Sequence, residues 1–582
     1  MKYKCISLLL GLSPLVMHAQ LAAEQVNVSR YWQQFSESRS ADSDLYDPAS
    51  KHKGDAVLNN FSYVGYQRGE QPLPSGNIAP NGATYKVFNV TDFGAIANDD
   101  KSDKAAIIAA IKQAELYVAG AKSSSAADAR AAIIAFPAGR LLINEESDVA
   151  AQQLINITTS NIVLRGAGQG KTELFMRKPL LPKDPHKMWS TPRLINFVSA
   201  NKGLPEQPVI ASVSSAHVAG SSKSIELNKQ YVVGVNFKVG DWVKLAATVK
   251  RVDYIQAQVA PYKLENRWTK LRNGLNLQEL HQIKAINGQQ VEFYSPIQVE
   301  VDPQDDWQLS KINMLENVGL EHMTIRGNWQ HEFKHHKLTD DGLIHDSAWS
   351  LVQYHRVANS WAQDLELVDF NAGLSLTIAS NSTLKNIQLN GNAGHLSVQM
   401  QFSFNNLSMN VTDNSNAWHA PGFSHMSSSN VHFKTKFNAN TSSDLHGAQP
   451  RLNLFDNVTG GWIYGRWGAA IMNQPNHLKG LVYWNYNNIG QPVSDFELMR
   501  KDNSFGRIIM PYLIGFHGAP ITVSDTQGYM QYVNDKGYAK YPEPVLAVPQ
   551  AYVESLGESV YPQSLYQAQV ERRLGYLPEW LK

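Results

Sequence analysis

Histidine and basic side chains are concentrated in one part of the chain, between residues 371 and 480. This stretch holds six histidines and six lysines or arginines, against three aspartates and no glutamate. An imidazole can take up or release a proton near neutral pH, and a guanidinium binds a carboxylate through two parallel hydrogen bonds. Such a set suits β-elimination next to a uronate. That reaction needs a base for the proton α to the carboxylate, a cation for the enolate-like charge and a proton source for the leaving oxygen.

Short turns recur along this stretch and predict how its side chains come together. Glycines at positions 373, 394, 422, 447 and 468 are 21, 28, 25 and 21 residues apart, and a strand-like run follows most of them. Stacked coils lie about 4.8 Å apart. Aligning the repeats on their glycines places five side chains near one surface strip: His395, His419, His425, His446 and Arg466. We therefore expect a single groove for an anionic, sugar-sized ligand.

Residue type predicts the roles in this groove. The predicted catalytic residues are two histidines, one of them the base or the acid, and two arginines that neutralise the substrate carboxylate: His419, His446, Arg451 and Arg466. The predicted substrate-binding residues come from the same coils and from a loop rich in His and Asp: His395, His425, Asn473, His477, Asp340 and Asp341. Any one histidine in such a turn can instead serve only as a hydrogen-bond partner for its neighbours. The many asparagines are expected to form turn ladders.

Two other functions remain open at this point. Glycoside hydrolysis needs two carboxyl groups placed around the scissile bond, and the three aspartates of the stretch fall on different coils or faces. A hydrolase would use Asp340 and Asp341 with Asp444 or Asp364. The second alternative is a solenoid that binds carbohydrate without turnover.

The recurrence of turns also predicts the fold. Strand-sized runs of alternating polarity, repeated every 20–30 residues and separated by Asn, Gly and Ser turns, are typical of a parallel β-solenoid. We predict an all-β chain that forms a single-stranded right-handed parallel β-helix. A helix is expected over residues 104–118, and strands of a small inserted β module with an Asn287-Gly288 hairpin turn are expected between residues 208 and 305.

The N-terminal coils carry motifs of a known family. These are Asp92-Phe93-Gly94-Ala95, Ser102-Asp103 ahead of the helix, Phe136-Pro137-Ala138-Gly139 and Leu164-Arg165-Gly166-Ala167-Gly168. Their order resembles the start of the pectate-lyase superfamily, specifically the rhamnogalacturonase/epimerase-like right-handed β-helices. The resemblance covers residues 85–180 and then the coils to about 490. It implies that the helix caps the open end of the solenoid, and it says little about the substrate.

Two further comparisons of motifs bear on function. The polygalacturonase-like hydrolases of the same superfamily carry an Asn-Thr-Asp motif, an Asp pair and a Gly-His-Gly motif. This chain has the pair Asp340-Asp341, but it has Gly394-His395-Leu396 in place of Gly-His-Gly and no Asn-Thr-Asp. The end of the chain, with His517-Gly518 and a short amphipathic helix that stops at Gly575, resembles an uncharacterised domain found behind such solenoids in secreted bacterial proteins.

Six segments are predicted from these patterns. They are a signal peptide (1–23), an N-terminal arm (24–84), the first coils with the capping helix (85–207), the inserted β module (208–305), the main coils with the groove (306–490) and a C-terminal segment (491–582).

The start of the chain and its composition predict the compartment. Lys2 and Lys4 precede an apolar run from 6 to 17 and then small residues, which predicts a secretory signal peptide and hence a secreted or periplasmic protein. No later segment is long and apolar enough to span a bilayer. Cys5, the single cysteine, lies inside the signal, so no disulfide is expected in the mature protein. A net charge of +1 argues against a nucleic-acid partner.

The expected partner is therefore an acidic polysaccharide, and no cofactor is expected. The histidines form no His-x-x-x-His pair on a predicted helix, which argues against a transition metal. Calcium is used by several related lyases, so the resemblance leaves it open, but the sequence shows no dense acidic site for it.

Overall fold

The computed structural model describes residues 26–40, 42–121, 128–184, 186–199, 210–228, 237–335, 347–500, 506–524 and 548–582. The predicted signal peptide lies outside the described residues, and so do Asp340 and Asp341. None of the helices in the described ranges is both long enough and apolar enough to cross a membrane.

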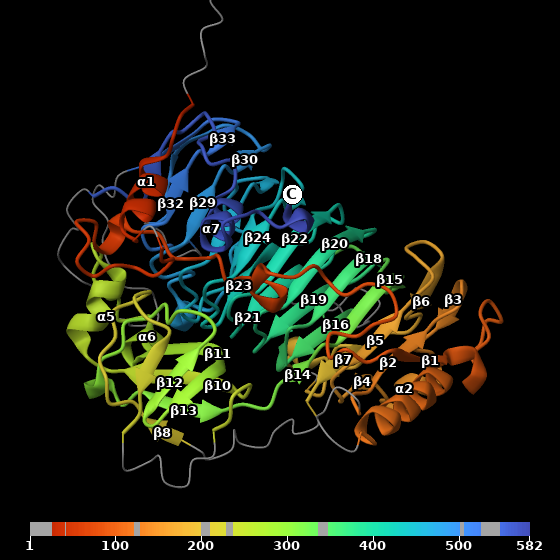
Figure 1. Cartoon of the computed structure of the whole chain (residues 1–582). Helices are drawn as coiled ribbons and strands as arrows, with labels where there is room; N and C mark the ends of the chain where they lie inside the picture. Colours follow the sequence, from red (N-terminus) through yellow and green to blue (C-terminus); the bar gives the residue numbers. More distant parts are fainter. Residues whose placement is uncertain are drawn as a thin grey trace, which may run out of the picture.

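The chain winds into stacked coils, and each coil adds one strand to each of two parallel sheets (Figure 1). In the first sheet, β18 (Trp361–Val368) pairs in parallel with β20 (Thr383–Asn390), which pairs with β22 (Leu407–Asp413). In the second sheet, β19 (Ala372–Thr377) pairs with β21 (Leu396–Gln401), which pairs with β23 (Ala420–Ser424). Because consecutive strands alternate between the sheets, the body is a parallel β-helix, as the repeat predicts.

The remaining strands of these sheets extend the stack in both directions. The first sheet also contains β1 (Tyr85–Asn89), β2 (Ala131–Ala135), β3 (Gly139–Leu142), β5 (Ile162–Arg165), β6 (Thr172–Phe175), β15 (Gly319–Arg326), β24 (Val431–Phe433), β25 (Lys436–Phe437), β27 (Leu454–Asp456), β28 (Thr459–Gly460), β29 (Val482–Trp484), β30 (Asn487–Asn488), β32 (Tyr512–Ile514), β33 (His517–Gly518) and β35 (Tyr552–Glu554). The second sheet also contains β4 (Ile155–Ile157), β7 (Ile195–Val198), β16 (Ser350–His355) and β26 (Ser443–Leu445). The ladder thus continues past residue 490, where the sequence period fades.

A third, narrower face closes each coil. It consists of β14 (Leu315–Glu316) on β17 (Val357–Ala358), followed by single parallel bridges that join Ala358, Ser380, Phe404, Ser428 and Arg451 in turn. Two short strands near the end, β31 (Val493–Phe496) and β34 (Ile521–Val523), form a separate parallel pair.

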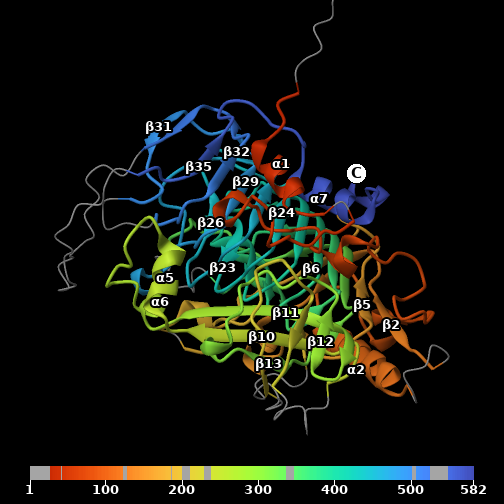
Figure 2. The ribbon, with the colours of Figure 1, turned by 60° about the vertical axis from the view of Figure 1, so that its left-hand side comes forward.

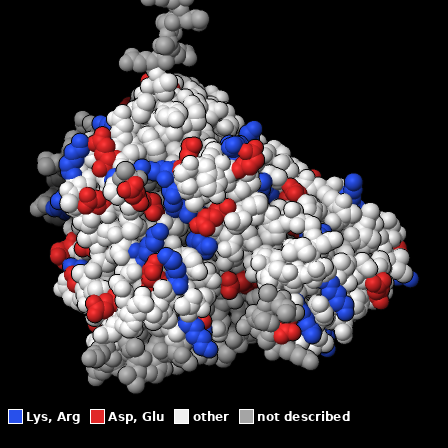
Figure 3. Space-filling view, viewed as in Figure 1, with Lys and Arg blue, Asp and Glu red and all other residues white. Residues whose placement is uncertain are grey.

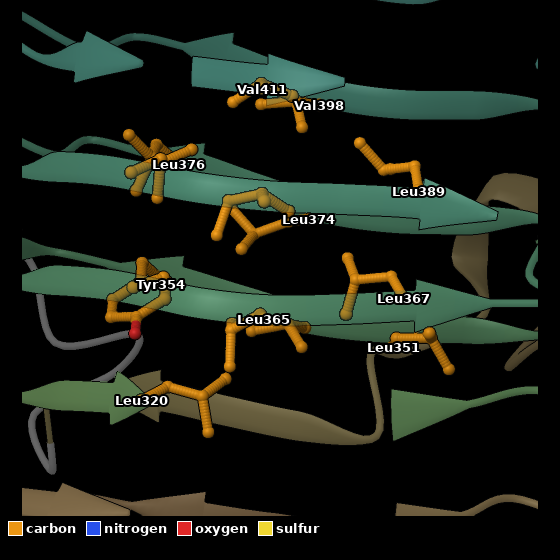
Figure 4. Packing of buried hydrophobic residues seen from close by; sticks show 14 of the residues in the cluster. Leu320, Leu351, Tyr354, Leu365, Leu367, Leu374, Leu376, Leu389, Val398 and Val411 are labelled. Carbon is orange, nitrogen blue, oxygen red and sulfur yellow. The ribbon is translucent and has the colours of Figure 1, made fainter. Parts of the chain in front are cut away.

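Aliphatic side chains of successive coils stack inside the helix. Leu365 lies opposite Ile387 in the first sheet, and Leu374 lies opposite Val398 in the second. All four are at most 1% exposed, and Figure 4 shows Leu365, Leu374 and Val398 among the leucines and valines that fill the interior. Alternate residues of a strand point to opposite sides, so the period-2 runs give this core directly. Each fully buried side chain contributes about 1.5–3 kcal/mol.

Asparagine ladders hold the corners, as expected. Asn406 Nδ2 donates to Asn430 Oδ1 at 3.0 Å, and Asn430 Nδ2 donates to Asn453 Oδ1 at 3.1 Å. Nearby turns place Asn381 (φ 45°) and Asn405 (φ 58°) in the left-handed region, which asparagine tolerates better than most residues.

The outer side of the first sheet is covered by both ends of the chain. Its outward apolar side chains, such as Met409, Phe433 and Trp484, pack in one cluster with Phe35 of α1 (Arg30–Glu37) and Val570 of α7 (Leu565–Leu574). Figure 1 shows α1 in red and α7 in blue on the same side of the coils. On that side, positive and negative side chains are interspersed (Figure 3).

An antiparallel module covers the third face. Its strands and helices are β8 (Ile210–Ser212), β9 (Ser224–Glu226), β10 (Trp242–Val249), α5 (Val252–Val259), α6 (Thr269–Arg272), β11 (Leu275–Asn287), β12 (Gln290–Phe293) and β13 (Gln308–Lys311). Trp242 and Leu280 pack on Phe404 of the third face, and Gln278 Nε2 donates to the Phe402 carbonyl at 3.0 Å. Figure 2 shows β10, β11 and β12 as a layer beside the coils.

Two helices accompany the first coils, α2 (Lys104–Ala119) and α3 (Glu146–Ala151). Ile107, Ile111 and Val118 of α2 belong to the same core cluster as the interior of the coils. In Figure 1, α2 lies beside β1 and β2 at the N-terminal end of the stack.

Asp456 ties α7 to the first sheet and makes stability depend on pH. Its buried carboxylate accepts hydrogen bonds from Ser564 Oγ at 2.7 Å and from the Tyr566 N–H at 2.8 Å. Burial nevertheless raises its pKa from 3.8 to about 7. The folded state therefore binds more protons than the unfolded state between about pH 4 and pH 7. In this window Asp456 lowers the free energy of unfolding as pH rises, by up to about 1.4 kcal/mol per pH unit.

We expect Asp456→Asn to remove this slope. Urea unfolding of both proteins at several pH values between about 4 and 7 should show the variant gaining stability relative to the wild type as pH rises. Asp495→Asn, at an exposed aspartate, is the matched control and should leave the slope unchanged. If the free energies of unfolding of Asp456→Asn and of the wild type change equally with pH, the assignment of this pH dependence to Asp456 is contradicted.

Candidate functional site

The second sheet carries a hollow of about 600 Å³ on its outer side. The first sheet is covered by the chain ends and the third face by the module, so the hollow occupies the remaining face. Its floor consists of outward side chains of β16, β19 and β21, including Gln353, Ser375 and Gln399. The rim on one side is the segment 189–193, and on the other it is Ala469, Ala470 and Asn473, next to η6 (Ile471–Asn473).

The floor is polar because alternate residues of each strand leave the core. In β21, Val398 and Met400 are buried inside the coil, whereas Gln399 and Gln401 line the hollow. Gln353, Ser375 and Gln399 are directly paired on three successive strands. The result is a floor of amide and hydroxyl groups, which suits the hydroxyls of a saccharide.

The observed register differs from the alignment on glycines. Gly373 lies beside Ser397 rather than Gly394, since Ala372 pairs with Leu396. Gly422 lies between Gln399 and Asp444. The glycine repeat therefore predicts the period of the coil but not its register, because turn glycines occupy different positions relative to the strands.

Gly422 has a structural role in the floor. A Cβ at this position would lie 2.0 Å from the Asp444 carbonyl oxygen, so only glycine fits. Because Gly422 has no side chain, Gln399 Nε2 reaches across it and donates to Asp444 Oδ2 at 2.8 Å. The amide thereby orients a buried carboxylate under the hollow.

Asp444 and His446 form a carboxylate–imidazole pair at the edge of the hollow. They are two residues apart at the end of β26, so their side chains share one side of the strand. His446 Nδ1 lies 3.1 Å from Asp444 Oδ2. Asp444 is fully buried, whereas the His446 side chain is 29% exposed and lines the hollow. No described residue accepts from or donates to His446 Nε2 in a hydrogen bond.

Each member of this pair changes the pKa of the other. Burial by itself would lower the pKa of His446, but the charge and hydrogen bond of Asp444 outweigh it, and the pKa is raised. Burial by itself would raise the pKa of Asp444, but the nearby His419 and His446 bring it below its ordinary value. Asp444 thus stays ionised and holds the His446 ring with Nδ1 protonated, which leaves Nε2 for proton transfer. From sequence, Asp444 is a candidate only for hydrolysis; its i, i+2 spacing from His446 is the signal for this role.

His419, predicted as an acid or base, lies behind the hollow. It is 2% exposed, and its Nδ1 lies 2.7 Å from the Arg466 carbonyl oxygen and 3.3 Å from Asp444 Oδ1. Burial lowers its pKa to about 4, so the ring is neutral at physiological pH. His419 therefore lacks the access to substrate that the predicted role requires.

The structure places three of the predicted binding residues on the hollow and one elsewhere. His395, His425 and Asn473 line it together with His446. His477 is fully buried at the end of the asparagine ladder, where its Nε2 lies 3.1 Å from Asn453 Nδ2. His477 thus occupies a ladder position inside the coil and does not line the hollow.

Neither of the predicted arginines lines the hollow. The Arg466 guanidinium stacks on Trp418 at 3.9 Å, and its Nη2 donates to the Asn440 carbonyl at 3.3 Å. Arg451 is bridged to Ser428 on the third face, where it is 7% exposed. The prediction for Arg466 uses the glycine alignment, from which the observed register departs, and Arg451 is placed only by its residue type in the next part of its coil.

A different arginine lies on the hollow. Arg193 precedes β7 and lines the rim, with Nη1 3.3 Å from Ser350 Oγ. Burial lowers its pKa to about 10, which leaves it charged at neutral pH. Among the described residues it has no carboxylate partner, and its Nε makes no hydrogen bond. Arg193 is not predictable from the sequence pattern because it lies about 180 residues before the histidine-rich stretch, on a coil that only stacking brings near.

The lining as a whole is basic and polar. Arg193 and three histidines line the hollow, and the described lining contains no aspartate or glutamate. Trp189, on the rim, is 67% exposed, and an exposed aromatic face beside polar groups suits a sugar ring.

Comparisons with known proteins give the following matches. A family model described as a domain of unknown function (DUF4955) matches residues 416–550 and 546–582, a region that includes Asp444 and His446. No curated protein matches the chain. Among solved structures, the tailspike protein gp49 of Pseudomonas phage LKA1 is 11% identical, with 75% of this chain and 64% of the tailspike covered at a TM-score of 0.40.

Two other solved structures are similar at the same level. The surface adhesin PfbA of Streptococcus pneumoniae is 11% identical, with 75% of this chain and 82% of the adhesin covered at a TM-score of 0.37. An exopolygalacturonase of Thermotoga maritima is 10% identical, with 77% of this chain and 89% of that enzyme covered at a TM-score of 0.31. This chain thus spans less than two thirds of the tailspike and most of the other two.

Proposed function

We propose that this protein is a secreted polysaccharide lyase that cleaves a uronate-containing chain by β-elimination. The observation that carries the proposal is the Asp444–His446 pair at the edge of a hollow whose described lining holds Arg193 and no carboxylate. Export is proposed from the signal-like sequence at residues 1–23.

The proposal gives each group a role. The substrate carboxylate binds Arg193, and the floor amides and Asn473 bind hydroxyls. His446 Nε2 removes the proton α to the carboxylate, while Asp444 stabilises the imidazolium that forms. Arg193 stabilises the enolate-like charge. The β C–O bond then breaks, a C=C bond forms, and the His446 proton passes to the leaving oxygen.

The hydrolase alternative is less well supported. Asp444 is fully buried and engaged by His446, His419 and Gln399, so it is not placed to attack or protonate a sugar. Asp364 lies on β18 of the first sheet, beside His322 at 3.3 Å and Asn386 at 2.9 Å, not on the hollow. Two carboxyl groups around one bond are therefore not found among the described residues of the site.

The decisive experiment follows the ultraviolet absorbance of unsaturated uronate products. The purified protein is incubated with alginate, pectate, glycosaminoglycans and algal glycans. An increase in absorbance with one of these substrates is expected. New reducing ends without that absorbance would support hydrolysis, and binding without cleavage would support a carbohydrate-binding solenoid.

Gly468 offers a test of the His446 position. A Cβ at residue 468 would lie 2.0 Å from His446 Cε1 and 2.1 Å from Nδ1, so Gly468→Ala must displace the ring. Misplacing a catalytic group by about 1 Å can cost on the order of 100-fold in rate. We expect kcat of Gly468→Ala to fall by about that factor.

Gly465→Ala is the matched control for this variant. Its Cβ would meet nothing within 4 Å, although its φ of +80° makes alanine strained. This variant should lose some stability and keep its turnover, measured by thermal unfolding and by product absorbance. Wild-type turnover in Gly468→Ala would show that catalysis does not depend on the position of the His446 ring.

A further inference from the structure

Three imidazoles meet beside the hollow, on residues far apart in sequence. The ring centroids of His335 and His395 are 4.9 Å apart, those of His395 and His419 are 5.2 Å apart, and those of His335 and His419 are 5.8 Å apart. One ligand nitrogen from each ring lies within 4.8 Å of the other two. Three nitrogens bound to one zinc ion at 2.0–2.1 Å lie about 3.4 Å apart, so small ring rotations complete the set.

The state of His419 points to a ligand at this position. Its Nδ1 lies 2.7 Å from the Arg466 carbonyl, which can only accept a hydrogen bond, so Nδ1 carries the proton. Nε2 then has a free lone pair. This atom is buried, since the residue is only 2% exposed, and it has no hydrogen-bond partner among the described residues. A buried unsatisfied imidazole nitrogen is costly unless something binds it.

We propose that His335, His395 and His419 bind a divalent transition metal ion, zinc in the first instance. Three neutral imidazoles plus one open position form a common zinc donor set. The arrangement around His419 supports this, because a metal-bound histidine usually donates its other N–H to a carbonyl or carboxylate. Here that position is held by the Arg466 carbonyl, with Asp444 Oδ1 at 3.3 Å.

The surroundings of His335 also favour a fixed position. Its ring stacks on Trp418 with centroids 5.3 Å apart and an interplanar angle of 16°. On Trp418, the Arg466 guanidinium also stacks, 3.9 Å from the ring. Trp418 is itself held by this contact, which helps to fix the place of the His335 ring stacked on it.

A second candidate set shares His419 with Asp444 and His446. In that set the two rings face Asp444 through their Nδ1 atoms, at 3.3 Å for His419 and 3.1 Å for His446. His446 Nδ1 is already hydrogen-bonded to Asp444, and His419 Nδ1 is already hydrogen-bonded to the Arg466 carbonyl. The set of three histidines uses no such carboxylate-bound ring besides His419, whose Nε2 has no partner among the described residues, and we take it as the better metal site.

The proposal does not depend on the reaction proposed above, since it concerns metal binding. His395 belongs both to the histidine set and to the lining of the hollow. The bound ion would therefore lie beside the space for the substrate.

The test uses the full-length mature protein, freed of metal by a chelator. Titration with zinc by isothermal calorimetry is expected to give one ion per chain, and cobalt(II) is expected to give the visible absorption bands of a tetrahedral site. His335→Ala and His395→Ala should each weaken zinc binding by more than about 100-fold, because even loss of an outer hydrogen-bond partner costs 10–100-fold. Both variants are checked for folding by thermal unfolding without metal.

His446→Ala is the matched control and should retain zinc affinity. Loss of binding in His446→Ala with retention in His335→Ala would overturn the proposal in favour of the second set. Absence of stoichiometric binding in the wild type would show that the histidines are only an aromatic packing cluster. Because the readout is metal binding, a failure of the proposed lyase activity leaves this test intact.

Discussion

His446→Gln is expected to lower kcat for elimination by about 10²–10⁴-fold, the range that general acid–base groups contribute. Glutamine keeps a polar side chain next to Asp444 but cannot exchange a proton at neutral pH. The Asp444 carboxylate, which is fully buried and 3.1 Å from His446 Nδ1, then has no basic partner to act through at the hollow. The measurement is the rate of unsaturated uronate formation at saturating substrate.

His425→Gln is the control for this prediction. His425 lines the same hollow, but its Nδ1 contacts Ser424 Oγ at 3.1 Å rather than a carboxylate. Burial lowers its pKa to about 4, so it lacks the acid–base properties of His446. A few-fold change is expected. If His425→Gln loses as much activity as His446→Gln, or if His446→Gln retains wild-type kcat, the assignment of the base is wrong.

Arg193→Ala is expected to lower kcat/KM for a uronate polymer by about 10²–10³-fold, comparable to removing one stabilising group from an oxyanion site. Arg193 is the one arginine in the described lining, and no described carboxylate neutralises it. Arg193→Lys keeps the charge but loses the two-point geometry, so an intermediate loss is expected. Steady-state kinetics measure the loss of catalysis, and binding of a non-cleaved oligosaccharide measures the loss of affinity.

Arg466→Ala is the matched control for Arg193. Arg466 is predicted from sequence to bind the substrate carboxylate, but its guanidinium stacks on Trp418 away from the hollow. Removing it should lower stability through lost packing and leave kcat/KM near the wild-type value. A large loss of kcat/KM in Arg466→Ala, with no loss in Arg193→Ala, would instead support the carboxylate-binding role that the sequence predicts for Arg466.

Part of the site follows from local sequence. The spacing of Asp444 and His446 puts both side chains on one side of a strand whatever the rest of the chain does. The excess of histidine over acids between residues 371 and 480 likewise indicates an anionic ligand from composition alone. The proposed zinc site, by contrast, does not follow from local sequence. The absence of a His-x-x-x-His pair argues only against a metal site on one helix, and it does not bear on histidine rings that the stacking of separate coils brings together.

The sequence by itself determined the period of the coils and their core, because alternation within a strand and recurrence of turns are local properties. Only the tertiary structure decided the register and the open face. Register depends on turn lengths and pairing between strands: Gly422 lies opposite Gln399 and Asp444 instead of aligning with Gly394. Access depends on segments far away in sequence, since α7 covers the first sheet and the module covers the third face, which leaves Arg193 and His446 on the outer side of the second sheet.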